Sequence, residues 1–252
     1  MSGVPPLPAA PPPLPGETAP EDASSLPSVP FRLWEPFAVF AFVFVTAGLV
    51  SIAITAATKG DLEKALLVAS FEVVLGAWTI GWVRLAHRRG TEALGARWDG
   101  FVSQIRFGLA AGAVGWVLST LVVGSVVLWI VSALSTGEVE SPDQLDYSSP
   151  GAGILALTAV GVVLVAPIAE ELFFRGLVFG AFRSRLRFVP AAVVSGALFM
   201  LAHAPFWLIL PSILTLGVVL AWVYQRRGSI VPCIVGHALF NAIGFAAYLV
   251  TR

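Results

Sequence analysis

Long apolar runs fill most of the chain from residue 34 onward, and polar residues gather in the connectors between them. A transmembrane helix needs roughly 20 mainly apolar residues. The runs are continuous rather than alternating, which favours membrane helices over barrel strands. The pattern predicts an all-α, polytopic transmembrane helical bundle of about seven spans, within a range of six to eight. The predicted spans cover residues 34–55, 65–83, 107–134, 153–182, 191–204, 206–224 and 230–250.

Two of these runs are irregular. The run at 153–182 is long and contains charged residues, and the run at 191–204 is short. Pro205 and Pro211 lie at the border between the fifth and sixth runs, where proline interrupts a regular helix. We therefore expect either run to be broken or tilted.

Composition supports a membrane protein and excludes several other classes. The chain is 57% hydrophobic and 12% charged, and its mean hydropathy is +0.87, whereas soluble domains carry about 25% charged residues. The net charge is zero, so no overall field points to a nucleic-acid partner. Cys233 is the only cysteine, which excludes a disulfide framework and any metal site needing several thiolates.

Arginines mark one side of the predicted bundle. Connectors at 84–106, 183–187 and 226–227 are arginine-rich, and seven spans place all three on the same side. Positive connectors stay cytoplasmic, so we predict a cytoplasmic N-terminus and an external C-terminus. The acidic stretch with Glu138, Glu140, Asp143 and Asp146 then lies on the opposite side.

The sequence divides into three parts. Residues 1–30 hold ten of the 18 prolines and predict a disordered, Pro-rich cytoplasmic tail with polyproline II character. It is either a solvated leader or a docking segment for a proline-binding partner. Residues 31–150 form N-terminal transmembrane helices, and residues 151–252 form a transmembrane core that carries most of the candidate catalytic residues.

Polar side chains inside the spans gather toward the C-terminus. A charged residue at mid-bilayer costs about 2.5–3.5 kcal/mol, so each one needs a reason. Glu72 matches no motif, and we expect it to pair with another span or to lie beside a cavity. The polar residues well inside the predicted spans are Glu72, Glu170, Glu171, Arg175, His203, His237 and Asn241.

The first cluster places two carboxylates on different faces of one helix. Glu171 and Arg175 are four residues apart and share a face, so they can form an ion pair. Glu170 is rotated by about 100° and points elsewhere. A carboxylate left unpaired in a low dielectric suits a general base. The alternative is a structural ion-pair network that holds helices together.

Two histidine motifs lie further along the chain. Phe199 lies one turn before His203, and His237 and Asn241 present an imidazole and an amide on one helical face. The second pair could bind a metal or donate hydrogen bonds to a developing oxyanion; the alternative is hydrogen bonding between helices. Counted along their spans, Glu170, His203 and Asn241 lie roughly 15–20 Å deep and His237 about 10 Å deep. The sequence therefore predicts that these groups meet in one layer of the bundle.

These three motifs, Glu-Glu-x-x-x-Arg, Phe-x-x-x-His and His-x-x-x-Asn, resemble the signature of the CPBP intramembrane proteases. That family includes the type II CAAX prenyl endopeptidases and the bacteriocin-processing Abi proteins. The resemblance covers roughly residues 153–245, in the family's order. Each motif alone is weak, and together on membrane helices they are specific.

The resemblance implies a glutamate-type intramembrane endopeptidase. Glu170 would activate a water that His203 orients, and His237 with Asn241 would form the oxyanion hole. The supporting residues would be Glu171, Arg175 and Phe199. We expect no cofactor: a zinc-dependent variant using Glu170, His203 and His237 is possible chemically but not favoured, because the chain has no HExxH motif and no thiolate pair.

The resemblance also sets the expected partners and the rival hypotheses. Substrates would be peptides or membrane proteins, with CAAX-like tails one class, in contact with the lipid bilayer and without nucleic acid. The Ala- and Arg-rich, Lys-poor composition indicates a bacterial plasma membrane. Rival hypotheses are a non-catalytic scaffold or immunity protein and a transporter that uses intramembrane Glu and His. Many transporters are built from internal repeats, and no such repeat is visible in this sequence.

Overall fold

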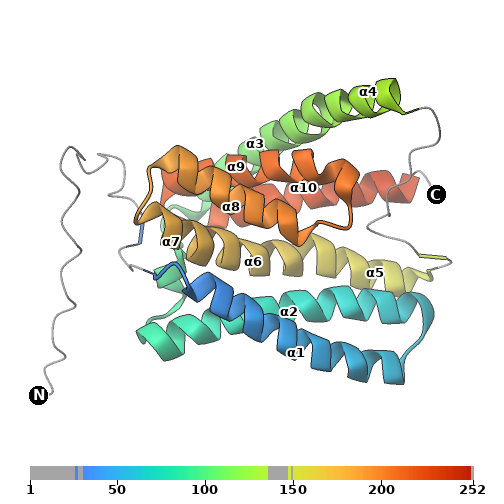
Figure 1. The fold of residues 1–252 in the computed structure, drawn as a ribbon, viewed down its shortest axis with the longest axis horizontal. Helices are drawn as coiled ribbons and strands as arrows, with labels where there is room; N and C mark the ends of the chain where they lie inside the picture. The colour runs from blue at the N-terminus through green and yellow to red at the C-terminus, as the bar shows by residue number, and fades with distance from the viewer. Residues whose placement is uncertain (1–25, 28–30, 136–146, 149, 251–252) are drawn as a thin grey trace, which may run out of the picture.

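The computed structural model describes residues 26–27, 31–135, 147–148 and 150–250 as a bundle of helices (Figure 1). No strand occurs among these residues. The N-terminal helices are α1 (Glu35–Ala57), α2 (Gly60–His87), α3 (Phe101–Trp116) and α4 (Ser125–Leu134), with a short 3₁₀ turn η2 (Thr91–Leu94) before α3 and a π-helical segment η3 (Val117–Gly124) joining α3 to α4. The C-terminal hairpin and last helix are α8 (Phe188–Ala202), η6 (Trp207–Ile209), α9 (Leu210–Arg227) and α10 (Val231–Val250).

Between them lies one long helix, Ala152–Arg183, which we call the motif helix because it carries the Glu-Glu-x-x-x-Arg motif. It consists of α5 (Ala152–Val160), η4 (Gly161–Val165), α6 (Ala166–Glu171), η5 (Leu172–Phe179) and α7 (Gly180–Arg183). In Figure 1 it runs through the middle of the bundle, between α1 and α2 on one side and α8 to α10 on the other.

The predicted all-α transmembrane bundle is confirmed, with one change in the number of full spans. Six helices of the described residues are long and apolar enough to cross a membrane. The predicted fifth span is α8, with 15 residues, about 22 Å long at 1.5 Å per residue. That is shorter than the ~30 Å hydrocarbon core. The irregularity expected there is therefore a helix that stops partway, before the turn that contains Pro205.

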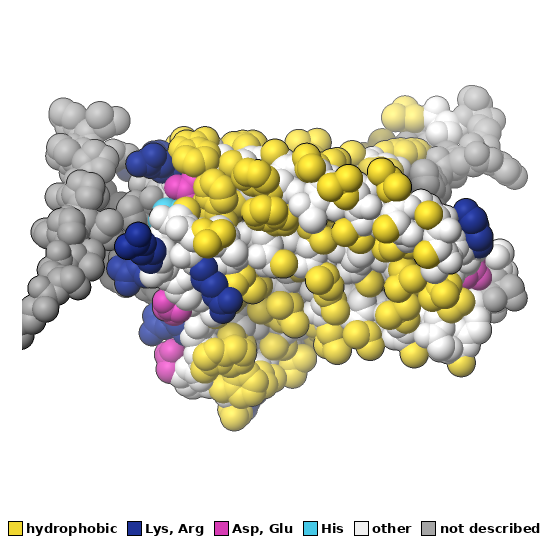
Figure 2. All heavy atoms as spheres, turned by 90° about the horizontal axis from the view of Figure 1, so that it is seen from below, with side chains coloured by type: hydrophobic (Ala, Val, Ile, Leu, Met, Phe, Trp, Pro, Cys, Tyr) yellow, Lys and Arg dark blue, Asp and Glu magenta, His cyan; other side chains and the backbone are white. Residues whose placement is uncertain are grey.

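Apolar side chains face outward over the middle of the molecule, as expected for a protein surrounded by lipid. Figure 2 shows a broad band of hydrophobic side chains, with Lys and Arg concentrated toward one end. Helix α4 has no buried residue, and Trp129 is 71% exposed. Water-soluble proteins rarely expose so large an apolar surface, so the chain is an integral membrane protein.

The three arginine-rich connectors meet at one end of the bundle. Arg185 donates to the carbonyl of Phe31, just before α1, and Arg227 donates to Ser103 near the start of α3. Ser229 donates to the carbonyl of Arg97, which joins the α9–α10 connector to the α2–α3 connector. The shared side predicted from the sequence is thus observed. Which compartment it faces stays a prediction, as does the bacterial plasma membrane.

Other predictions fall outside the described part of the chain. The Pro-rich tail lies outside it except for residues 26–27, and so does the acidic stretch from Glu138 to Asp146. The division into 31–150 and 151–252 stays a prediction, although the buried core draws on helices from both parts.

Glycines allow the helices around the motif helix to approach closely. A Cβ built on Gly217 of α9 would lie 2.8 Å from the Cα of Gly196 on α8, and one on Gly112 of α3 would lie 2.6 Å from the Gly236 carbonyl oxygen of α10. Small residues at such crossings let membrane helices pack backbone to backbone. These contacts hold α8 against α9 and α10 against α3, and His203 and His237 lie at the end of α8 and on α10.

Candidate active site

The Glu-Glu motif sits on a short α-helical segment between two π-helical segments. Segment α6 ends with Glu170 and Glu171, η4 precedes it, and η5 begins at Leu172. π-helical turns change the phase of side chains around a helix and occur frequently at functional sites. They were not predicted, because hydrogen bonding between residues five apart leaves no mark in a continuous apolar run.

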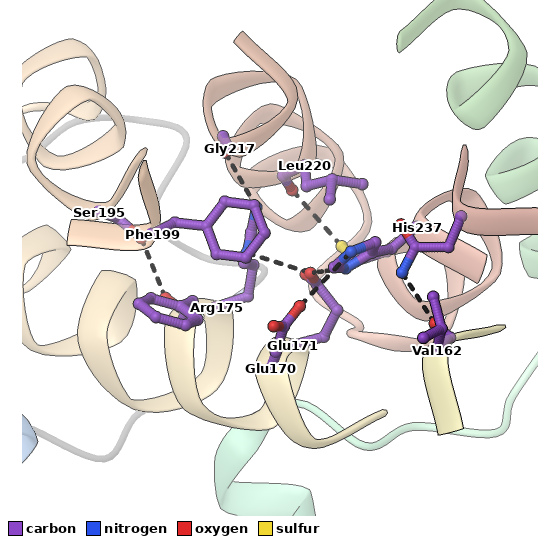
Figure 3. A network of polar contacts seen from close by, with 12 residues as sticks. Val162, Glu170, Glu171, Arg175, Ser195, Phe199, Gly217, Leu220 and His237 are labelled. Atoms are coloured by element: carbon purple, nitrogen blue, oxygen red, sulfur yellow. Dashed lines mark hydrogen bonds and ion pairs between the residues drawn. The ribbon is translucent and has the colours of Figure 1, made fainter. Parts of the chain in front are cut away.

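Glu171 and Arg175 form the ion pair that their spacing predicts. Arg175 Nη1 lies 3.0 Å from Glu171 Oε1, and both residues are fully buried. Glu171 Oε1 also accepts from His237 Nδ1 at 2.9 Å, whereas Glu171 Oε2 has no hydrogen-bond partner. The Nη1 contact is not aligned as a hydrogen bond. Oε1 therefore carries two charge-assisted contacts at once (Figure 3).

Arg175 is held by two further contacts with the α8–α9 hairpin. Its Nη2 donates to the carbonyl of Gly217 at 3.3 Å, and its guanidinium carbon lies 4.8 Å from the centre of the Phe199 ring. A desolvated cation over an aromatic face contributes about 2 kcal/mol. Arg175 thus ties the motif helix to both helices of the hairpin.

Glu170 points to the two histidines rather than to the ion pair's arginine. Its Oε1 lies 3.9 Å from His203 Nε2, and its Oε2 lies 3.5 Å from His237 Nε2. The side chain is 11% exposed. The expected difference between the two carboxylates is therefore present, with His237 in contact with both of them.

His203 has a defined donor and acceptor side. It follows the last residue of α8, with φ −104° and ψ 15°, and its Nδ1 lies 2.9 Å from the carbonyl oxygen of Phe199. A carbonyl can only accept, so Nδ1 carries a hydrogen. In the neutral ring, Nε2 is then an acceptor that faces Glu170.

His237 faces a carboxylate with each ring nitrogen. Its Nδ1 contacts Glu171 and its Nε2 faces Glu170. Carboxylates only accept, so Nδ1 donates to Glu171, whereas the 3.5 Å contact of Nε2 with Glu170 is not aligned as a hydrogen bond. Nε2 carries a hydrogen as well only in the imidazolium form of the ring.

Asn241 lies one turn beyond His237 on α10, and its amide nitrogen donates to the carbonyl of Val162 at 2.8 Å. Val162 belongs to η4. The structure therefore brings Glu170, His203 and His237 together directly, while Asn241 is anchored to the same motif helix at an earlier turn. An amide group has two N–H donors, so one remains for another acceptor.

Phe199 contacts several members of the site. Its ring meets those of His203, His237 and Phe174 edge-on, at centroid separations of 4.9, 5.7 and 5.0 Å. It is 1% exposed. Phe199 thus packs against both imidazoles and against Arg175, and its supporting role in catalysis stays a prediction.

The metal-dependent alternative concerns the same side chains. Among the residues that the structure describes, no group of three His, Cys, Asp or Glu side chains is arranged to hold a metal ion. The expectation that no metal is needed, with Glu170, His203 and His237 as the alternative ligand set, stays a prediction.

Sequence reasoning missed several contacts that shape the site. Gly217 supplies a carbonyl to Arg175, and Val162 supplies one to Asn241. Backbone acceptors carry no residue-type signal, although a glycine within an apolar span is a mark of close helix packing. At the arginine-rich end, His87 lies 2.6 Å from buried Glu35, which also accepts from Trp82. This second polar cluster joins α1 to α2.

The region that carries these groups is similar to a known protein family. Residues 152–243 match the family described as Type II CAAX prenyl endopeptidase Rce1-like. All seven motif residues fall within this Rce1-like region, so the resemblance recognised in the sequence is confirmed there. The family is described as one of endopeptidases, and the match covers this region of the chain.

One curated relative is similar to part of the chain. Over 85 residues the chain is 32% identical to UPF0177 protein YxdF of Lactococcus lactis subsp. lactis (strain IL1403), which is 33% of this chain and 46% of that protein. The chain thus spans about half the length of this relative. No solved structure matches the chain.

Proposed function

We propose that the chain is an intramembrane endopeptidase in which Glu170 activates a water for attack on a peptide bond. The observation that carries the proposal is the position of Glu170, a carboxylate inside the bundle whose two oxygens each face an imidazole of a different helix. The Rce1-like match of this region to a protease family supports it.

The gap between Glu170 and His203 suits the attacking water. Glu170 Oε1 and His203 Nε2 are both acceptors and lie 3.9 Å apart, a separation at which a bridging water is expected. A water oxygen about 2.8 Å from each of these two atoms would see them at an angle of about 90°, close to the angle between the O–H bonds of water. Such a water donates both hydrogens and directs its lone pairs away from the two acceptors, toward a substrate carbonyl.

The reaction then needs one proton to move twice. Glu170 takes a proton as the water oxygen bonds to the carbonyl carbon, and the carbonyl oxygen becomes an oxyanion. Glu170 returns the proton to the amide nitrogen as the C–N bond breaks, giving a carboxyl and an amino end. His237 Nε2–H and the second N–H of Asn241 are the donors for the oxyanion, where one donor contributes about 3–4 kcal/mol.

Glu171 and Arg175 hold these groups without taking part in the proton transfer. Glu171 accepts from His237 Nδ1 and so directs Nε2 toward Glu170. Arg175 compensates the Glu171 charge and links it to Phe199, whose carbonyl orients His203. The two imidazoles are therefore positioned through one connected set of contacts.

The substrate class is inferred from the location of the site. Glu170 and His237 are buried inside a transmembrane bundle, so the scissile segment must reach them from the bilayer or its surface. We propose membrane proteins, peptide leaders or lipidated CAAX-like tails as substrates, with the first two favoured in a bacterial membrane.

The test is cleavage of membrane-tethered and lipidated peptides by purified protein, comparing wild type with Glu170→Ala, each with and without a chelator. We expect cleavage that the substitution abolishes and chelation leaves unchanged. Loss on chelation with recovery on added zinc would replace this mechanism with a metal-dependent one. Equal cleavage by Glu170→Ala would remove Glu170 from the reaction, and a folded wild type that cleaves nothing would favour a scaffold.

A further inference from the structure

Glu72 is a buried carboxylate that the proposed reaction does not use. It lies near the middle of α2, and the residue is 8% exposed. Its Oε2 has no hydrogen-bond partner, and no cation forms an ion pair with it among the described residues. An ionisable side chain without a partner inside a membrane bundle is costly, and it is a candidate contact for a ligand. Of the two expectations from the sequence, pairing with another span is not observed.

An apolar groove runs beside Glu72, between α2 and the motif helix. The two helices touch where Gly76 meets Ala169: a Cβ at Gly76 would lie 3.4 Å from that of Ala169. The groove has a volume of about 200 Å³, and Glu72 is its single ionisable lining residue, the others including Val73, Ile80 and Ile168. Figure 1 shows α2 alongside α6 over this stretch.

The groove has the size of one side chain rather than of a helix. A cavity of about 150 Å³ holds a molecule as large as benzene, whereas pockets for whole drug-sized ligands begin at about 300 Å³. An occupant that fits is therefore a single long side chain. Because the wall is apolar and one carboxylate lines it, the matching chemistry is an apolar stem that ends in a cation, which describes lysine and arginine.

Charge in the bundle interior points the same way. Glu171 is compensated by Arg175, whereas Glu72 Oε2 has no partner among the described residues. A cation placed beside Glu72 would supply that partner. A lipid acyl chain in the same groove would leave the oxygen without one.

We propose that the groove beside Glu72 is a subsite that receives a lysine or arginine side chain of the substrate, close to the bond that is cleaved. This rests on the proposed function, because it assumes a peptide substrate at Glu170. Glu72 is then a specificity-determining residue that touches the substrate without acting on the reacting atoms.

The experiment measures binding separately from cleavage. Fluorescent membrane-spanning Leu/Ala peptides, identical except for one central Lys, Met or Glu, are titrated into nanodiscs that contain wild type, Glu72→Gln or Glu63→Gln. Glu63 lies on the same helix, away from the groove, and is the matched control. Cleavage of the same peptides is followed by mass spectrometry.

We expect wild type and Glu63→Gln to bind the Lys peptide about tenfold more tightly than the Met peptide, as one desolvated charge pair allows. Glu72→Gln should bind both equally and unfold at no lower temperature, since it removes an unpaired charge. Glu72→Asp keeps the charge and should keep a reduced preference. Equal binding of Lys and Met peptides by wild type, or a preference that survives in Glu72→Gln, would overturn the proposal.

Cleavage distinguishes this failure from a failure of the proposed function. If Met and Lys peptides are cleaved equally and bound equally, the subsite is refuted while the protease stands. If the Lys preference depends on Glu72 but nothing is cleaved, the subsite stands as a binding site and the proposed reaction is the part that fails.

Discussion

Replacing Arg175 with methionine should expose how much the site depends on its buried ion pair. The change leaves Glu171, which is fully buried, without the guanidinium 3.0 Å away. Removing one partner of a buried ion pair destabilises a protein by about 3–5 kcal/mol. We count the lost cation–π contact with Phe199, about 2 kcal/mol, as part of that total. At roughly 2–4 °C per kcal/mol for a chain of this size, the unfolding midpoint should fall by about 10 °C.

A double-variant cycle isolates the pair from the two side chains themselves. Glu171→Gln removes the charge but keeps an amide oxygen that can accept from His237. The double variant Glu171→Gln/Arg175→Met should therefore recover at least about 2 kcal/mol relative to Arg175→Met alone. Thermal unfolding in detergent, followed by intrinsic fluorescence, measures all four proteins.

The matched control is Arg106→Met, because Arg106 is an exposed arginine on α3. It should change stability by no more than about 0.5 kcal/mol. The reasoning is refuted if Arg175→Met is as stable as this control, or if the double variant is no more stable than Arg175→Met.

Two further predictions concern the oxyanion donor and the helix packing. Asn241→Leu should lower kcat about 10²–10³-fold with KM little changed, in steady-state assays of a cleaved peptide; a change confined to KM would contradict the oxyanion role. Gly217→Ala should destabilise the protein by about 1–3 kcal/mol, because the new Cβ would lie 2.8 Å from the Cα of Gly196. Gly244→Ala, with nothing within 4 Å of its Cβ position, is the control for thermal unfolding, and equal stability of the two variants would argue against the packing account.

The sequence predicted the bundle well because the membrane imposes a strong pattern. Each long apolar run became a helix, and the arginine connectors share one end as expected from their alternation along the chain. The exception is α8, because the apolar run at 191–204 was counted as a span although it is short. Its end at Ala202 is set by the turn at His203 and by Pro205, which a count of apolar residues does not capture.

The site was predictable in its residue types and less so in its contacts. The i, i+4 spacing of Glu171 and Arg175 is enough to foresee their pairing. The position of Asn241 was not foreseeable, because its partner is a backbone carbonyl in a π-helical segment. Nor could spacing show that one histidine, His237, would contact both glutamates.

The central claim is that Glu170 is the base, and it is tested most directly by single-turnover cleavage with Glu170→Gln. Gln keeps the size of the side chain but cannot take a proton from water, and Glu63→Gln makes the same change outside the site. The account predicts that Glu170→Gln binds the peptide, unfolds at a temperature close to wild type and cleaves at least about 10³-fold more slowly, while Glu63→Gln cleaves normally. Cleavage by Glu170→Gln within a few fold of wild type would contradict the account.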